Sequence, residues 1–139
     1  MNLFADALRW LERSHGFCQK IRIKDTYTDE EYDHFETLTS RYARVTDMLI
    51  SKVFRSLDRV EFLQSGTLID VVNRAHKRNL IDSVDQLRSL KDLRNDIAHE
   101  YAHGNLPELF KEVFAVIPIL QDIATKTTDY ARQYLTSPQ

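Results

Sequence analysis

Apolar residues recur at intervals of three and four along nearly the whole chain, which is the spacing that buries one side of an α-helix. Short polar connections, two of them containing Gly66 and Gly104, separate these apolar runs. The pattern predicts five helices, over residues 2–23, 28–60, 67–79, 82–103 and 106–134, the first beginning at Asn2 or Asp6. Gly16 weakens the first helix, and Pro118 is expected to kink or divide the last one.

The second helix is the longest, on the order of 45 Å at 1.5 Å per residue. It therefore either spans a bundle or extends beyond it to a second subunit. Its charged side, which includes Arg41, Arg44 and Asp47, is expected to face solvent. The residues expected to point inward from the second and third helices are Phe35, Leu38, Tyr42, Val45, Leu49, Val53, Leu57, Val60, Leu68, Val71, Val72 and Ala75. The predicted fold is an all-α, up-and-down bundle of four to five helices.

Composition narrows the classes of protein. With 139 residues, 42% of them hydrophobic, the chain is expected to be a single domain over 1–139. Cys18, the only cysteine, cannot form an internal disulfide, and it lies on an apolar side where a core position is expected. The first residues do not resemble a signal peptide and no apolar run reaches the length of a membrane span, so we expect a cytoplasmic protein.

The net charge of −2 argues against a protein that coats nucleic acid, because such proteins need a broad basic face. Any chemistry on nucleic acid must therefore be local. Two basic clusters occur at predicted helix ends, one of Lys20, Arg22 and Lys24 and one of Arg74, His76, Lys77 and Arg78. Favourable charges at a helix C-terminus explain such clusters, and contact with an RNA backbone is the alternative.

The helix at 82–103 carries a charged residue on its apolar side. Asp82 or Ser83 is the expected N-cap, and Gly104 ends the helix. At about 100° per residue, Arg94 falls within the apolar arc. That arc is formed by Leu87, Leu90, Leu93, Ile97, Tyr101, Val84 and Ala98, and Asn95 and His99 lie on its margin. A guanidinium is costly to desolvate, so Arg94 either pairs with a carboxylate from another helix or binds an anion.

The neighbours of Arg94 favour an anion. Lys91 and Arg88 follow Arg94 along the same side of the helix, and Asn95 and His99 lie beside them one turn apart. Three cations, one amide and one imidazole on one flank are suited to bind phosphate.

The segment 94–101 reads R-N-D-I-A-H-E-Y and contains the pattern R-x-x-x-x-H-x-Y. The chain thereby resembles the HepT-like branch of the HEPN superfamily, over essentially its whole length. This resemblance implies a metal-independent endoribonuclease without a cofactor, acting on RNA as the toxin of a bacterial type VII-like toxin–antitoxin system. It also implies a cognate nucleotidyltransferase antitoxin, which attaches AMP to the tyrosine that matches Tyr101.

The residues of the motif can carry this reaction, which needs a base, an acid and positive charge against the phosphate. His99 is expected to transfer protons, and Arg94 to hold the phosphate through two hydrogen bonds. Asn95 is expected to orient the phosphate or His99, and Lys91 to contact a neighbouring phosphate. Because Arg94 and His99 are about 140° apart on an ideal helix, one copy surrounds a phosphate poorly. We therefore predict a two-fold homodimer with a composite site.

Two other functions stay open at this point. The segment 99–103 also reads H-E-x-x-H, the zinc-peptidase signature. Gly104 ends that helix at once and no third ligand stands out among His15, His34 and His76, so no metal site is expected. A non-catalytic accessory subunit of a nucleotidyltransferase could use Arg94 and His99 to hold a nucleotide, and the acidic pI of 6.2 favours that alternative.

Overall fold

The structure, a computed structural model, describes residues 2–64 and 66–135, and every regular element among them is a helix. The elements are α1 (Asn2–Ile21), α2 (Asp29–Met48), the π-helical turn η1 (Leu49–Val53), α3 (Phe54–Val60), α4 (Leu68–Lys77), α5 (Val84–His103) and α6 (Leu106–Leu135). Because α2, η1 and α3 follow one another without interruption, they form one long rod. The all-α prediction is confirmed, and the predicted ranges match these helices closely.

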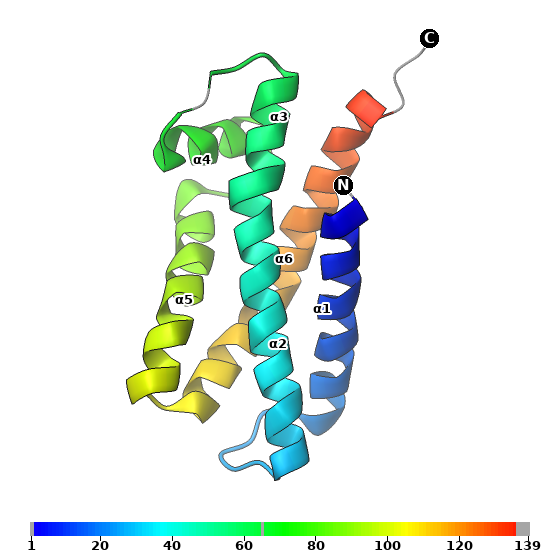
Figure 1. The fold of residues 1–139 in the computed structure, drawn as a ribbon. Helices are drawn as coiled ribbons and strands as arrows, with labels where there is room; N and C mark the ends of the chain where they lie inside the picture. The colour runs from blue at the N-terminus through cyan, green and yellow to red at the C-terminus, as the bar shows by residue number, and fades with distance from the viewer. Residues whose placement is uncertain (1, 65, 136–139) are drawn as a thin grey trace.

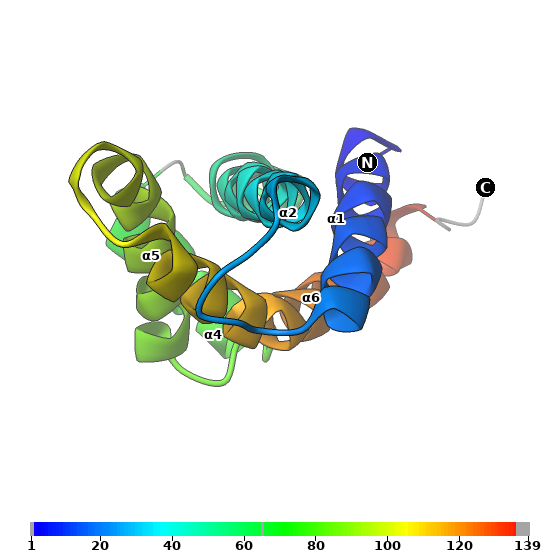
Figure 2. The same ribbon diagram turned by 90° about the horizontal axis from the view of Figure 1, so that it is seen from below.

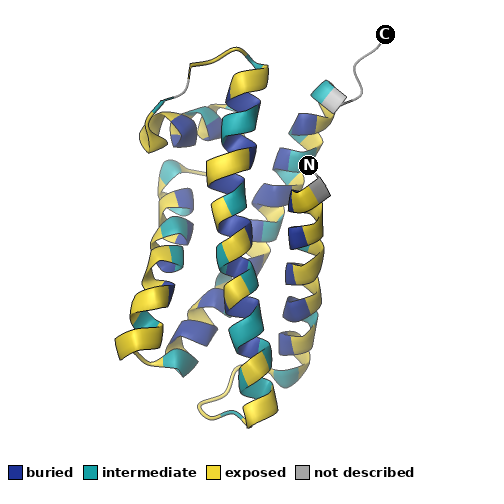
Figure 3. Cartoon of the chain, in the orientation of Figure 1, coloured by how far each residue is buried: buried dark blue, intermediate teal, exposed yellow. Residues whose placement is uncertain are grey.

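Four long rods alternate in direction, and α4 lies across one end of them (Figure 1). Seen along the rods, α2 lies between α1 and α5, with α6 behind it (Figure 2). The up-and-down arrangement is therefore confirmed. The buried residues match this arrangement, because the dark-blue faces of the rods in Figure 3 point toward one another. Among the described residues, no helix is both long and apolar enough to span a membrane.

Side-chain caps begin three helices at predicted positions. The Thr28 hydroxyl accepts a hydrogen bond from the Glu31 N–H at 3.2 Å, and the Glu31 carboxylate accepts one from the Thr28 N–H at 3.0 Å. Thr67 begins α4 with the same reciprocal arrangement. Ser83 rather than Asp82 caps α5, its hydroxyl accepting from the backbone N–H three residues later at 3.0 Å. Each cap satisfies backbone groups that a helix leaves unpaired at its first turn.

The π-helical turn in the long rod was not predicted. The Phe54 N–H donates to the Leu49 carbonyl five residues earlier, which widens the helix for one turn. Because the wider turn rotates the side chains that follow, the adjacent pairs Leu49–Ile50 and Val53–Phe54 are all buried. The rod therefore keeps its apolar side on the core over its full length.

Three expectations about individual residues are wrong. Val60, the last residue of α3, is 46% exposed, because the rod has passed the end of the bundle there. Leu68, the first residue of α4, is 37% exposed, while Val71, Val72 and Ala75 of the same helix are buried as predicted. Of the two alternatives expected at Pro118, a kink or a division, division is wrong, because α6 continues through Pro118 to Leu135.

Buried charges join α3 to α4. The Asp58 side chain is only 4% exposed and pairs with Arg74 at 3.1 Å and with Arg78 at 2.8 Å. Arg78 also pairs with Glu61 at 2.5 Å. Arg74 and Arg78 of the second basic cluster therefore bind carboxylates at the neighbouring helix. The sequence pattern predicted only favourable charges at a helix end or contact with RNA for this cluster, and it did not predict these ion pairs.

The same network reaches α6. Tyr130 donates a hydrogen bond to Glu61 at 2.5 Å, and Tyr134 donates another to the same carboxylate. The Arg78 guanidinium lies 5.9 Å from the centre of the Tyr130 ring. Arg78 thus holds together the ends of three helices at the upper end of the bundle in Figure 1.

We predict that Arg78→Met destabilises the fold by about 3 kcal/mol, because it leaves the buried Asp58 carboxylate with one partner fewer. Equilibrium unfolding in urea measures this change. Lys77→Met, at the exposed neighbouring position, is the matched control and should lower the free energy of unfolding by less than about 0.5 kcal/mol. Equal losses in the two variants would show that the network does not hold the three ends together.

Candidate functional site

The position of α5 decides where the motif residues lie. Its buried side chains pack toward the core, and they are Leu87, Leu90, Leu93 and Ile97. The rods α2 and α5 run antiparallel beside each other (Figure 1). The buried Tyr42 hydroxyl of α2 donates a hydrogen bond of 2.6 Å to the Leu90 carbonyl of α5. Arg94, one turn after Leu90, therefore lies against α2.

Arg94 forms an ion pair with Asp47 of α2. Its Nε lies 2.9 Å and 3.0 Å from the two carboxylate oxygens. The hydrogen bond to Asp47 raises the pKa of Arg94 above its ordinary value. The predicted alternative of a carboxylate partner on another helix is thus confirmed. The pair is open to solvent, since the Arg94 side chain is 31% exposed and the Asp47 side chain 52% exposed.

The pair leaves part of the guanidinium unused. Only Nε of Arg94 contacts Asp47, and within the described residues neither terminal nitrogen has a hydrogen-bond partner. A guanidinium binds a phosphate most strongly through two parallel N–H groups. Asp47 therefore holds the Arg94 side chain in place, while the two terminal nitrogens of Arg94 stay available to an anion.

Asn95 and His99 lie on the exposed part of α5. In the portion of the chain that the structure describes, neither side chain has a hydrogen-bond partner, so no hydrogen bond joins His99 to Arg94. The His99 and His103 rings are 5.4 Å apart at an interplanar angle of 56°. Ala98 is also exposed, so its predicted place on the apolar side is wrong. The motif helix turns this surface away from α2 and α6, toward solvent.

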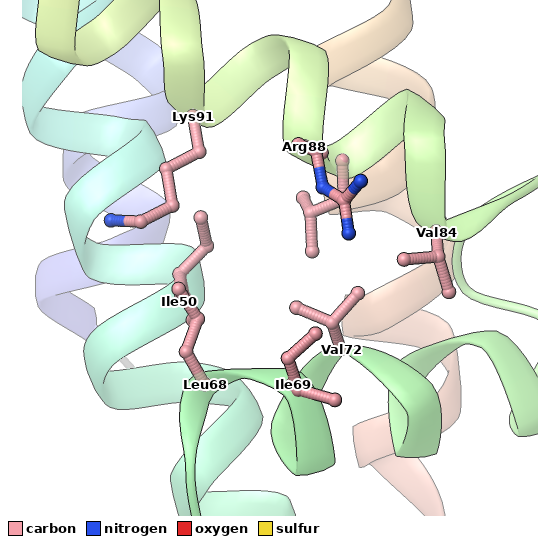
Figure 4. A pocket seen from close by; sticks show the side chains of 8 residues that line it. Ile50, Leu68, Ile69, Val72, Val84, Arg88 and Lys91 are labelled. Atoms are coloured by element: carbon pink, nitrogen blue, oxygen red, sulfur yellow. The ribbon is translucent and has the colours of Figure 1, made fainter.

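Lys91 and Arg88 line a small apolar pocket one and two turns before Arg94. Figure 4 shows both side chains at its rim, where Arg88 also pairs weakly with Asp85 at 3.7 Å. The cavity measures about 70 Å³, and its other lining residues are Ile50, Leu68, Ile69, Val72, Val84 and Leu87. The predicted flank of three cations is therefore divided between this pocket and the Asp47 pair.

Tyr101 lies seven residues after Arg94 and also faces α2. Partial burial, followed by the nearby Glu36 carboxylate and Tyr32, raises the pKa of Tyr101 to about 12. The nearby Thr39 hydroxyl opposes this rise in the pKa of Tyr101. The residue is still 38% exposed. The side chain is thus partly exposed, and its hydroxyl is protonated at neutral pH.

The sequence interpretation missed Asp47, which it assigned to a solvated face. A signal was present, because Asp47 is the only acidic residue between 42 and 53 of the long helix. An antiparallel neighbour places the middle of one helix beside the middle of the other. Arg94, halfway along its helix, then had a single carboxylate within reach.

The H-E-x-x-H segment does not form a metal cluster. Glu100 of this segment accepts a hydrogen bond from the Asn105 N–H at 3.2 Å and so helps to end α5. Within residues 2–64 and 66–135, no group of three or more His, Cys, Asp or Glu side chains is placed to hold a metal ion. His99 and His103 therefore lack the third protein ligand that a zinc peptidase needs.

Comparison with protein-family models, with curated proteins and with solved structures finds no match for this chain. Its candidate site is therefore defined by the residues of α5 and by their contacts with α2.

We predict that Arg94→Ala and His99→Ala both fold like the parent chain. The Arg94–Asp47 pair is open to solvent and should contribute less than about 1 kcal/mol, and His99 has no buried contacts to lose. Leu93→Ala, one position before Arg94 and only 9% exposed, is the control and should cost about 3 kcal/mol. Urea unfolding distinguishes these cases. A loss from Arg94→Ala as large as that from Leu93→Ala would mean that Arg94 is structural.

Proposed function

We propose that this chain is a HEPN-type endoribonuclease, the toxin of a type VII-like toxin–antitoxin pair. The observation that carries the proposal is the state of Arg94, which is held by Asp47 through Nε while its outer nitrogens have no partner among the described residues. An arginine prepared in this way is suited to a phosphate. The next turns of the same helix present Asn95 and His99 to solvent, where a large substrate can reach them.

In the proposed reaction, the ribose 2′-hydroxyl attacks the adjacent phosphate and the 5′-oxygen of the next nucleotide leaves. His99 takes the proton of the attacking 2′-hydroxyl and gives it to the departing 5′-oxygen, and Arg94 stabilises the negative charge that builds up on the phosphate oxygens. Asn95, one residue after Arg94, orients the phosphate or His99. Lys91 contacts a neighbouring phosphate from the rim of its pocket.

The placement of these side chains supports a composite site. Arg94 points to α2, whereas His99 lies on the exposed surface of α5, and the two do not touch within the described part of one chain. Two copies of α5 facing each other across a two-fold axis would bring the arginine of one subunit to the histidine of the other. We therefore propose a homodimer as the active form.

Tyr101 is the proposed silencing site, to which a nucleotidyltransferase partner transfers AMP. Tyr101 lies two turns after Arg94 on the same α2-facing side, so the phosphate of an attached AMP could reach back to neutralise Arg94 and obstruct the site. Because the pKa of Tyr101 is raised to about 12, its hydroxyl is a poor nucleophile by itself at neutral pH. The transferase must therefore supply the base that removes its proton.

A non-catalytic accessory subunit is the second candidate function. The pocket below Arg88 and Lys91 favours it, because an apolar cavity with two cations at its rim can hold a base and its phosphates (Figure 4). Its volume of about 70 Å³ is small for that purpose, and the nuclease is the better supported function.

We predict that expression of the chain in bacteria stops growth and degrades RNA, and that His99→Ala and Arg94→Ala lower the cleavage rate about 100-fold or more. Growth curves and RNA gels from matched cultures measure this, and purified protein should cleave equally well with a chelator present. His103→Ala is the control, because it removes an exposed imidazole 5.4 Å from His99. If neither the parent chain nor any variant is toxic and the protein is dimeric, the accessory subunit becomes the better account.

We predict that incubation with the cognate nucleotidyltransferase and ATP adds AMP to the parent chain and abolishes cleavage. Intact-mass analysis of Tyr101→Phe should show no added AMP, whereas Tyr27→Phe, a tyrosine beside the first connection, should gain it normally. The same gain of mass on Tyr101→Phe would assign the modification to another residue.

We predict a dimer in solution, and light scattering coupled to size-exclusion chromatography measures the mass directly. The chain mass is 16.3 kDa, so monomer and dimer are well separated. A strictly monomeric protein that still cleaves RNA would contradict the composite site.

A further inference from the structure

The helix α1 lies on the side of α2 away from α5 (Figure 2), and a second group of cations belongs to α1 and α2. We call it the α1–α2 cationic face, and it consists of Arg9, Arg13, Lys20, Arg41 and Arg44. Within the described residues, none of the five forms an ion pair with a carboxylate. By contrast, Arg74, Arg78 and Arg94 all do. The positive charge of this face is therefore not neutralised locally, although Asp6 lies along the same side of α1.

Two exposed aromatic rings lie among these cations. Trp10 is 41% exposed, with the Arg9 guanidinium 4.7 Å and the Arg41 guanidinium 5.2 Å from its ring centre. Phe17 is 37% exposed, with Arg13 5.0 Å from its ring centre, and it already stacks on the His34 ring at 4.9 Å, so Trp10 is the ring that remains available to a base. Large apolar rings that remain exposed beside unpaired cations do not serve the core, and such surfaces are typical of binding sites.

Arg41 is fixed within this face. Its Nη1 donates to the Trp10 carbonyl at 3.1 Å and to the Ser14 hydroxyl at 2.6 Å. Partial burial and the nearby Arg13 lower the pKa of Arg41, as expected where no anion compensates the charge. A hollow of about 240 Å³ lies beside it, lined by Ala7, Trp10, Arg41 and Arg44.

We infer that the α1–α2 cationic face binds single-stranded RNA, with phosphates on its cations and a base stacked in the hollow beside Trp10. Flat rings interleaved with fixed cations are what a single strand requires, because bases stack on aromatic rings and on guanidinium planes while cations follow the backbone. An acidic protein is the alternative partner for this face, but it would bind the cations without needing the exposed rings. The stretch from Arg9 to Lys20 extends about 16 Å along α1.

This inference rests on the proposed function and gives the RNA a path to its cleavage site. Arg44 lies on the exposed side of α2, three residues before Asp47, which holds Arg94. A strand that crosses α2 at Arg44 passes from the α1–α2 cationic face to Arg94. The face would then increase affinity for RNA without taking part in the chemistry.

Trp10 is the only tryptophan of the chain, so its fluorescence reports on this face alone. A single-stranded 2′-O-methyl RNA, which cannot be cleaved, is titrated into the protein at several salt concentrations, and anisotropy of a labelled copy gives Kd. We expect quenching of Trp10 on binding. Arg9→Gln with Arg13→Gln should weaken binding at least tenfold and lower the slope of log Kd against log salt by about 1.4, or about 0.7 for each lost phosphate contact.

The matched control is Lys77→Gln with Lys111→Gln, which removes the same charge from exposed positions on α4 and α6 and should leave Kd within twofold. The inference is overturned if RNA binds without changing Trp10 fluorescence, if the control weakens binding equally, or if poly-glutamate but not RNA quenches Trp10. This test needs no cleavage. If RNA quenches Trp10 but the parent chain never cleaves RNA, the nuclease proposal fails and the binding site stands. If the chain cleaves RNA but Trp10 fluorescence does not change, the binding site is wrong and the nuclease proposal stands.

Discussion

The hydrogen bond from the buried Tyr42 hydroxyl to the Leu90 carbonyl sets the axial position of α5 against α2. A polar group in the core must find a partner, so a slide of α5 by one residue would leave this hydroxyl unsatisfied. All later contacts between the two helices depend on the same alignment. It brings Arg94 to Asp47, and Tyr101 to the group of Glu36, Tyr32 and Thr39. The candidate site is thus a consequence of how two antiparallel helices are aligned.

The distribution of charge is compatible with the proposed action on RNA by a chain with a net charge of −2. Several of its arginines fall into three groups with different surroundings. Arg78 is buried between two carboxylates and holds helix ends together. Arg94 shares one nitrogen with Asp47 and keeps two for a ligand, whereas the α1–α2 cationic face has no carboxylate partner in the described part of the chain. Net charge averages over these groups and therefore underestimates what each surface can bind.

The helices could be predicted from the sequence because their signals are local. Thr28, Thr67 and Ser83 cap their helices through side chains that lie within three residues of the bonds they make. The π-helical turn at Leu49–Val53 could not be predicted, because it depends on which neighbours the rod must bury against. Leu68 and Val60 were misassigned for a related reason, since periodicity does not show where a helix leaves the bundle.

The candidate site was predicted only in part. Periodicity correctly placed Arg94 toward a neighbouring helix and His99 and Asn95 on an exposed margin, because both follow from the geometry of one helix. The partner Asp47 belongs to another helix 47 residues away and required the alignment of α2 with α5. The roles of Arg94, Asn95, His99, Lys91 and Tyr101 in catalysis and silencing are still proposals that rest on the motif and on these contacts.

The most direct test of the account mixes two inactive variants. Arg94→Ala and His99→Ala proteins are purified separately, unfolded, mixed and refolded together, and RNA cleavage is compared with that of each variant refolded alone. If arginine and histidine act on one phosphate from different subunits, mixed dimers contain one intact pair and the mixture recovers a measurable part of the parental activity. If the parent chain cleaves RNA but the mixture is as inactive as its components, the site lies within one chain and the composite arrangement is wrong.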